Sequence, residues 1–180
     1  ADVGPLAIAE VGASAGLNLS LDRFSYRYRW PGSEQVTSIG PASAVTIDCD
    51  WRGDDEPPGA VPPIAVAHGL DAAPIDVADT EAVRWLEACI WPDEPERRDR
   101  FVAAVALALA AKVNVQAGDA VDDVAALVHD VGVDAHPVVI TTWVLNYMSS
   151  ERRAGFVAEL DRIGDRRDLS WIAAESPLSC

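Results

Sequence analysis

The chain has few basic residues, and lysine is the scarcest of them. Its 180 residues include 14 Lys and Arg against 29 Asp and Glu, for a formal net charge of −15, and Lys112 is the only lysine. A protein that binds nucleic-acid phosphates needs a basic face, and anionic membrane surfaces also attract basic segments. The charge therefore argues against both kinds of partner. The use of arginine in place of lysine indicates a GC-rich bacterial coding bias.

Cysteine is also scarce. The three cysteines are Cys49, Cys89 and Cys180, and no two of them form a C-x-x-C pair. An odd number at these spacings argues against a disulfide framework, and no His and Cys spacing typical of zinc is present. We therefore expect reduced thiols, a cytoplasmic location and no metal.

Long apolar runs are absent. The longest, residues 101–111, is too short to span a bilayer, and we expect it to form a buried helix. Apolar residues nevertheless make up 49% of the chain, which is enough to build a core. The length and composition predict a single domain over residues 1–180.

Strand-like and helix-like segments alternate along the chain. Short apolar runs predict strands over residues 6–11, 64–71, 113–116, 138–145 and 169–174. Helices are predicted over residues 17–24, 80–90, 96–112, 121–131 and 150–163, with Asp79 and either Ser149 or Ser150 as N-caps. This alternation predicts an α/β fold, a Rossmann-like three-layer sandwich whose central sheet is mostly parallel.

Two insertions interrupt the alternation. Residues 26–30 and 44–51 have the pattern of extended segments, and we expect them to pair as a β-hairpin within an insert over residues 26–51. A second, helical insert covers residues 79–112.

The turn after the first predicted strand has the sequence Gly12-Ala13-Ser14-Ala15-Gly16, which allows two interpretations. In a nucleotide-type glycine loop, Gly12 and Gly16 permit a tight turn, and Glu10 accepts a hydrogen bond from the ligand. In a nucleophile elbow of the G-x-S-x-G type, Ser14 is the nucleophile and needs a histidine base. The histidines that follow it are His68, His129 and His136, each of which also has a purely structural interpretation.

Carboxylates also end the next two predicted strands of the sheet. Asp71 follows Gly69-Leu70, and Asp119 follows Gly118 and precedes the small residue Ala120. Ligands of open parallel sheets bind beyond the carboxyl ends of the strands. Asp71 is therefore placed to bind a ribose diol, and Asp119 to accept from an adenine amino group.

This combination resembles the class I S-adenosylmethionine-dependent methyltransferases over nearly the whole chain. Residues 10–16 resemble their first motif, Gly69-Leu70-Asp71 their ribose-binding strand end, Gly118-Asp119-Ala120 their adenine-side motif, and residues 142–148 their fourth-strand segment. The resemblance implies S-adenosylmethionine as the cofactor. The contacts it implies are Glu10, Gly12, Ser14, Gly16, Asn18, Asp71, Asp119 and Ala120.

A second resemblance is to a largely actinobacterial family catalogued as domain of unknown function 2332. It rests on residues 10–18, on Ile90-Trp91-Pro92-Asp93 and on an arginine soon after. The resemblance to this family identifies relatives of the chain, but it does not imply a reaction.

The sequence departs from the methyltransferase pattern at two places. The insert at residues 26–51 lengthens the spacing between Gly12 and Asp71, which leaves Asp48 and Asp50 as rivals for the ribose contact. The antiparallel strands that normally close the sheet are absent after Leu178. We therefore expect either a fragment of a longer protein, truncated at its ends, or an edge that is built differently.

Methyl transfer depends mainly on positioning the acceptor and excluding water. The candidates for contacting the acceptor are Asn146 and Tyr147 in a catalytic role, and Trp91, Asp93, Arg97 and Trp143 in substrate binding. The structural alternatives are Tyr147 in the core with Asn146 capping a turn, and an Arg97–Asp93 pair beside a structural Trp91.

Three hypotheses follow. The leading one is methyl transfer from S-adenosylmethionine to a small-molecule or other acceptor. The second is a serine hydrolase that uses Ser14. The third is a catalytically inactive methyltransferase fold that serves as a binding module.

Overall fold

A sheet of five parallel strands forms the centre of the protein. The structure is a computed structural model that describes residues 4–52, 54–132 and 134–176. The strands of this central sheet are β1 (Leu6–Val11), β5 (Ile64–Asp71), β6 (Asn114–Ala117), β7 (His136–Thr142) and β8 (Ser170–Ala174). They lie in the order β6-β5-β1-β7-β8, and every neighbouring pair is parallel.

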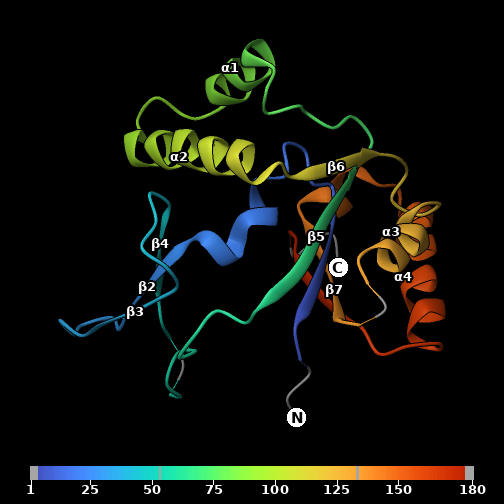
Figure 1. The fold of residues 1–180 in the computed structure, drawn as a ribbon, viewed down its shortest axis with the longest axis horizontal. Coiled ribbons are helices and arrows are strands. Elements are labelled where there is room, and N and C mark those ends of the chain that lie inside the picture. Colours follow the sequence, from blue (N-terminus) through green and yellow to red (C-terminus); the bar gives the residue numbers. More distant parts are fainter. Residues whose placement is uncertain (1–3, 53, 133, 177–180) are drawn as a thin grey trace.

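Helices lie on both faces of this sheet and beyond its carboxyl edge (Figure 1). They are η1 (Leu17–Arg23), α1 (Thr80–Ala88), α2 (Pro95–Ala111), α3 (Val124–Asp130), η2 (Val144–Tyr147) and α4 (Ser150–Gly164), where η marks a 3₁₀-helix. Asp79 caps α1 by accepting from the backbone N–H groups of residues 81 and 82, and Ser149 caps α4. The predicted α/β fold, a Rossmann-like three-layer sandwich, is confirmed.

Alternation along the strands separates two apolar layers. Ala7, Ala9 and Val11 of β1 pack with the buried side chains of α3 and α4, whereas Ile8 packs with Leu19 of η1 on the opposite face. Figure 1 shows α3 and α4 together on one side of the sheet. Because successive strand residues point to opposite faces, one short apolar run supplies both layers.

The strand order reverses beside β1. The chain proceeds from β1 outward through β5 and β6, then returns to the other side of β1 with β7 and continues to β8. Ligands of doubly wound sheets bind at such a switch point, beyond the carboxyl ends of the strands. The loops after β1, β5, β6 and β7 are therefore the ones that build the site.

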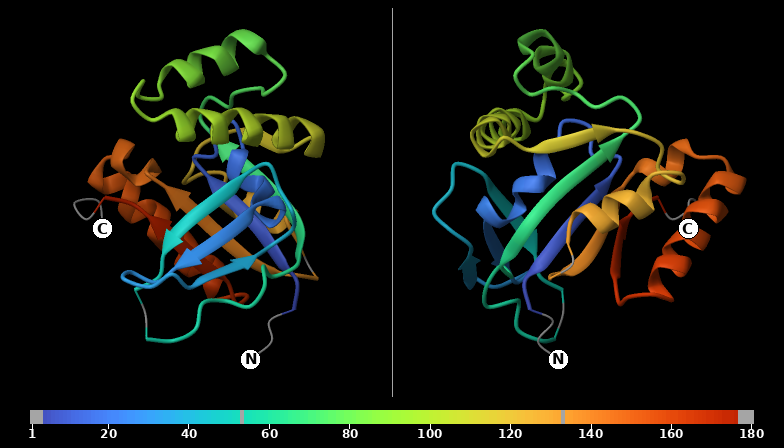
Figure 2. Two further views of the ribbon diagram at one scale, coloured as in Figure 1. Left: turned by 90° about the vertical axis from the view of Figure 1, so that its left-hand side faces the viewer. Right: turned by 45° about the vertical axis from the view of Figure 1, so that its right-hand side comes forward.

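A separate three-stranded sheet follows η1. It consists of β2 (Ser25–Arg29), β3 (Val36–Ile39) and β4 (Thr46–Asp50), in the order β3-β2-β4. The predicted hairpin between residues 26–30 and 44–51 is wrong, because β2 pairs with β4 in parallel and forms its antiparallel hairpin with β3. This sheet lies on the side of the central sheet away from α3 and α4 (Figure 2).

The helical insert extends beyond the carboxyl edge of the central sheet. Figure 1 shows α2 over that edge, with α1 on the outer side of α2. The expectation that residues 101–111 are buried is wrong for most of them, since only Ala104 and Ala108 of α2 are buried, while Val102 and Leu109 are about half exposed, at 48% and 51%. Small side chains let α2 approach η1 on one face, and another part of α2 contacts α1, where Arg98 pairs with Glu87 at 2.6 Å.

In the described part of the chain, no helix has both the length and the apolar character that a membrane span requires. Cys49 and Cys89 are free thiols, and Cys180 lies outside the described residues.

Candidate functional site

The turn after β1 is held in an unusual backbone conformation. Gly12 and Gly16 have φ angles of 77° and 67°, and Ser14, which is not a glycine, has a φ of 52°. A Cβ atom on Gly12 would lie 2.6 Å from the Cβ of Val144, so glycine is required here by conformation and by space. Ser14 occupies the place of the middle glycine in the usual motif and still adopts the left-handed conformation.

Asp71 at the end of β5 holds this turn in place. Its Oδ2 accepts a hydrogen bond from the backbone N–H of Ser14 at 2.8 Å, and its Oδ1 accepts from the N–H of Ala73 at the same distance. Each carboxylate oxygen has a second acceptor position. Asp71 therefore links β1 to β5 and can still accept hydrogen bonds from a ligand.

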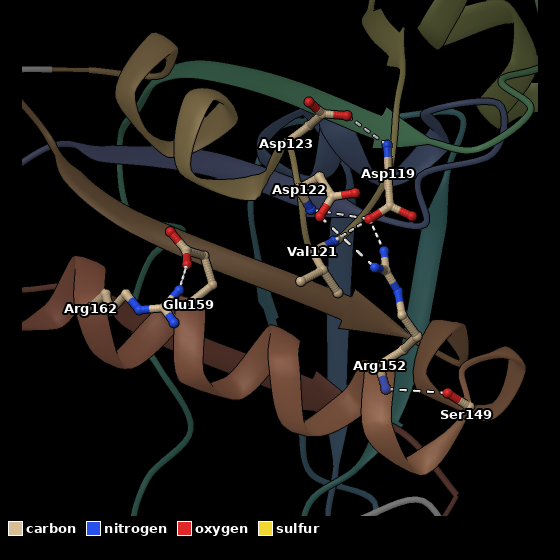
Figure 3. Close-up of polar contacts among 8 residues, drawn as sticks. All are labelled: Asp119, Val121, Asp122, Asp123, Ser149, Arg152, Glu159 and Arg162. Atoms are coloured by element: carbon tan, nitrogen blue, oxygen red, sulfur yellow. Dashed lines mark hydrogen bonds and ion pairs between the residues drawn. The ribbon is translucent and has the colours of Figure 1, made fainter.

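Only one of the two carboxylate oxygens of Asp119 accepts hydrogen bonds from the described residues. Its Oδ1 accepts from the backbone N–H groups of Val121 and Asp122, at 2.8 and 3.0 Å, and from Arg152 of α4. Hydrogen bonds from that backbone, together with Arg152, hold the pKa of the Asp119 carboxyl below its usual range. Figure 3 shows all these contacts converging on the same oxygen. The other oxygen, Oδ2, accepts no hydrogen bond from any described residue.

Asp71 and Asp119 line one cavity of about 620 Å³, which we call the Asp71–Asp119 pocket. Gly12, Val144 and Tyr147 also line this pocket. Ala120 lines it as well, with a small, half-buried side chain. The volume is in the range of small-molecule sites. Asp48 and Asp50 do not line it, and Asp48 is paired with Arg27 and Arg29 of the small sheet.

Glu10 is a buried carboxyl next to the turn. Its side chain is only 2% exposed, and burial raises its pKa from the ordinary 4.5 to about 7. Oε1 accepts a hydrogen bond from the Asn18 amide at 2.7 Å, but the buried Oε2 has no partner among the described residues. An unpaired buried acceptor is costly in a folded protein and marks a place where a ligand can donate a hydrogen bond.

Glu10 lines a different cavity, of about 500 Å³, which we call the Glu10 pocket. Its walls come from the turn at residues 12–15, from η1 and the small sheet, and from α1 and α2. Arg97 and Arg100 of α2 also line it.

The three acidic strand ends therefore do not share one cavity. Asp71 and Asp119 lie together, Glu10 lies in the neighbouring pocket, and Gly12 lines both. Asn18 lies with Glu10, as does Ser14, while Gly16 packs against Val115 of β6.

The residues predicted to contact the methyl acceptor do not lie together. Arg97 lines the Glu10 pocket, whereas Trp91, which is 70% exposed, and Asp93 line neither pocket. The expected pair between Arg97 and Asp93 is wrong, because Arg97 pairs with Glu94 at 3.0 Å. Trp143 is exposed, with a φ of 60°, and β7 ends just before it, at Thr142, three residues before the predicted end.

Asn146 and Tyr147 lie on η2, beside the Asp71–Asp119 pocket and not the Glu10 pocket. Tyr147 lines the former and is 89% exposed, so its alternative placement in the core is wrong. The Asn146 side chain donates to the carbonyl of Trp143, as expected for a residue that caps a turn.

Two arginines at the pockets were not predicted. Arg100 lines the Glu10 pocket, and Arg152 lines the Asp71–Asp119 pocket and pairs with Asp119. The one available signal for Arg100 was its spacing of three residues from Arg97, which places both on the same face of a helix. No sequence signal pointed to Arg152.

None of the three histidines lines the cavity that Ser14 lines. His68, His129 and His136 line neither pocket. His136 contacts Ser170 at 2.9 Å near the start of β7, at the opposite edge of the sheet. Within the described ranges, no group of three or more His, Cys, Asp or Glu side chains is placed to hold a metal ion.

The fold and these cavities define an α/β protein of the doubly wound type, with two small-molecule-sized pockets at the switch point of its sheet. The chain belongs to the family described as "Uncharacterized protein conserved in bacteria (DUF2332)", whose model matches residues 2–179. No curated protein and no solved structure matches the chain.

Proposed function

We propose that this protein is a methyltransferase that uses S-adenosylmethionine as its methyl donor. The observation that carries the proposal is the Asp71–Asp119 pocket, in which two carboxylates from neighbouring parallel strands meet beside a glycine turn. Open acceptor positions on both carboxylates fit the donors of an adenosyl group. The resemblance of residues 10–16 to the first methyltransferase motif supports the same assignment.

The chemistry of the pocket matches the parts of an adenosine. Asp71 has acceptor positions left for two ribose hydroxyls, and the open Oδ2 of Asp119 can accept from an adenine amino group. Ala120 leaves room for a flat base. When bound, S-adenosylmethionine supplies a methyl group on a positively charged sulfur.

The two pockets meet at Gly12, which lines both of them. A ligand with its adenosine beside Asp71 could therefore present its methyl group toward the Glu10 pocket. The walls from α1 and α2 would keep water from the reacting atoms, which is what methyl transfer needs most.

Calorimetric titration with S-adenosylhomocysteine tests the proposal, with a matched pair of variants. In Asp119→Asn, the amide keeps one oxygen for the backbone N–H groups but replaces the other with a donor. We expect a loss of affinity of about tenfold, since one hydrogen bond is removed. Asp122→Asn makes the same charge change at a side chain that does not line the pocket, and it should bind like the wild type.

The absence of binding by the wild-type protein, with its fold verified by circular dichroism, would refute the cofactor assignment. Equal losses in the two variants would show that charge alone, and not the Asp119 position, determines the affinity. Binding without turnover on any acceptor would leave the third hypothesis, an inactive binding module.

The positive φ of Ser14 favours one second candidate, the serine hydrolase. A nucleophile elbow places its serine on a strained turn between strand and helix, as here. Labelling by a fluorophosphonate probe that disappears in Ser14→Ala would support it. The distribution of the histidines favours the methyltransferase, because none of them lines the cavity that Ser14 lines.

A further inference from the structure

The Glu10 pocket combines an apolar interior with a few polar groups. Phe24, Val45 and Ile47 line it from the side of η1 and the small sheet, and Leu86, Phe101 and Ala104 line it from the helical insert. A cavity with these walls and about 500 Å³ of space suits the apolar body of a small molecule.

Two guanidinium groups line the same cavity from α2. Arg97 is paired with Glu94 in an exposed ion pair. Arg100 is half-buried and forms no ion pair with any residue in the described ranges. A partly buried arginine without a carboxylate partner, beside an apolar wall, is suited to bind an anion in the planar, two-point geometry that carboxylates offer.

The net charge of the whole protein opposes the binding of an anion at this pocket. The protein has a formal net charge of −15, so its average field repels anions. An anion that binds here must therefore be held by these arginines and by the apolar contacts, not by general attraction.

The third polar group is Glu10 on β1, whose buried Oε2 has no partner in the described part of the chain. Such an oxygen needs a donor from the ligand, an N–H or O–H group. A ligand that satisfies the whole cavity thus has a donor, an apolar body and an anionic group.

We propose that the Glu10 pocket binds the methyl acceptor, and that this acceptor is a small carboxylic acid with an apolar body and an O–H or N–H group. The carboxylate lies at Arg97 and Arg100, and the O–H or N–H group faces Glu10 next to Gly12. The identity of the pocket as an acceptor site rests on the proposed function, whereas its preference for an apolar carboxylate rests on the side chains that line it.

The test uses 4-hydroxyphenylacetate as the probe and 4-hydroxyphenylacetamide, its neutral analogue, as the comparison. Calorimetric titrations are made on the wild-type protein, on Arg100→Gln and on Arg166→Gln. Arg166 is exposed, follows α4 and does not line the pocket, so it controls for the change in net charge. Each titration is repeated with saturating S-adenosylhomocysteine.

We expect the carboxylate to bind the wild type more tightly than the amide does. Arg100→Gln should lower the affinity for the carboxylate by roughly 10- to 100-fold, since a charge-assisted hydrogen bond is lost. Arg166→Gln should leave its affinity unchanged, and S-adenosylhomocysteine should not displace it.

Other outcomes overturn the inference. If the carboxylate does not bind, binds no better than the amide or is weakened equally by both variants, the arginines do not form an anion site. If S-adenosylhomocysteine displaces it, the pocket belongs to the amino acid end of the cofactor. If S-adenosylhomocysteine itself does not bind while the carboxylate does so through Arg100, the anion preference stands and the proposed function fails.

Discussion

Burial of the Glu10 carboxyl makes the stability of the protein dependent on pH in a way that one substitution removes. Gln is close to Glu in shape and cannot ionise. In Glu10→Gln, the side-chain oxygen can still accept from Asn18, as Oε1 does in the wild type at 2.7 Å. The buried amide leaves unpaired N–H groups, whose cost does not vary with pH.

The magnitude follows from the pKa of Glu10. Its folded value of about 7 lies above the ordinary 4.5, so between these values the folded chain keeps a proton that the unfolded chain has lost. Neutral Glu10 therefore contributes its full stability below pH 4.5, and that contribution is lost as the pH rises through 7. At about 1.4 kcal/mol per pKa unit, the loss is about 3 kcal/mol.

The assay is urea unfolding of the wild type and of Glu10→Gln at several pH values between 5 and 8. The difference in the free energy of unfolding between the two proteins should move by about 2 to 3 kcal/mol in favour of the variant over this range. Glu34→Gln makes the same substitution at an exposed side chain and serves as the matched control. A pH-independent difference for Glu10→Gln would refute the reasoning, because it would mean that Glu10 is as well solvated in the folded protein as in the unfolded chain.

Two further substitutions test the fold. Gly12→Ala should destabilise the protein by about 2 to 5 kcal/mol in urea unfolding, because it combines a left-handed backbone with a contact of 2.6 Å to Val144; a cost below about 1 kcal/mol would contradict the packing of this turn. Phe156→Ala should cost about 3 to 5 kcal/mol, since Phe156 is fully buried. It should also change the fluorescence of Trp171, whose ring centroid lies 5.7 Å from that of Phe156, and unchanged emission would contradict this contact.

The central sheet was predictable because its strands carry their own local signal. The apolar runs at residues 6–11 and 64–71 are short, are followed by turn residues and alternate with helical segments, so strand positions and parallel pairing followed from the pattern. The small sheet was not predictable in the same way. β3, at Val36–Ile39, has four residues within a loop-like stretch, and the parallel pairing of β2 with β4 depends on contacts distant in sequence.

The site was predictable as a set of loops but not as a set of cavities. Glu10, Asp71 and Asp119 all lie at carboxyl ends of strands, as their positions in the sequence indicated. Their division between two pockets depends on where each side chain points and on the helical insert, which covers Glu10 with residues more than 70 positions away. The role of Arg152 was not visible for the same reason, since α4 and Asp119 meet only in the folded chain.

Gly12 lines both cavities, so the backbone of one residue borders the two sites that we propose for the cofactor and the acceptor. A ligand that displaced this backbone in one cavity would change the shape of the other. Thermodynamic linkage then imposes a reciprocal relation: whatever factor a nucleoside beside Asp71 applies to the affinity for an acid beside Arg100, the acid applies the same factor to the nucleoside. Two binding titrations on the wild-type protein must give the same factor, and its size measures how strongly the turn after β1 couples the two cavities.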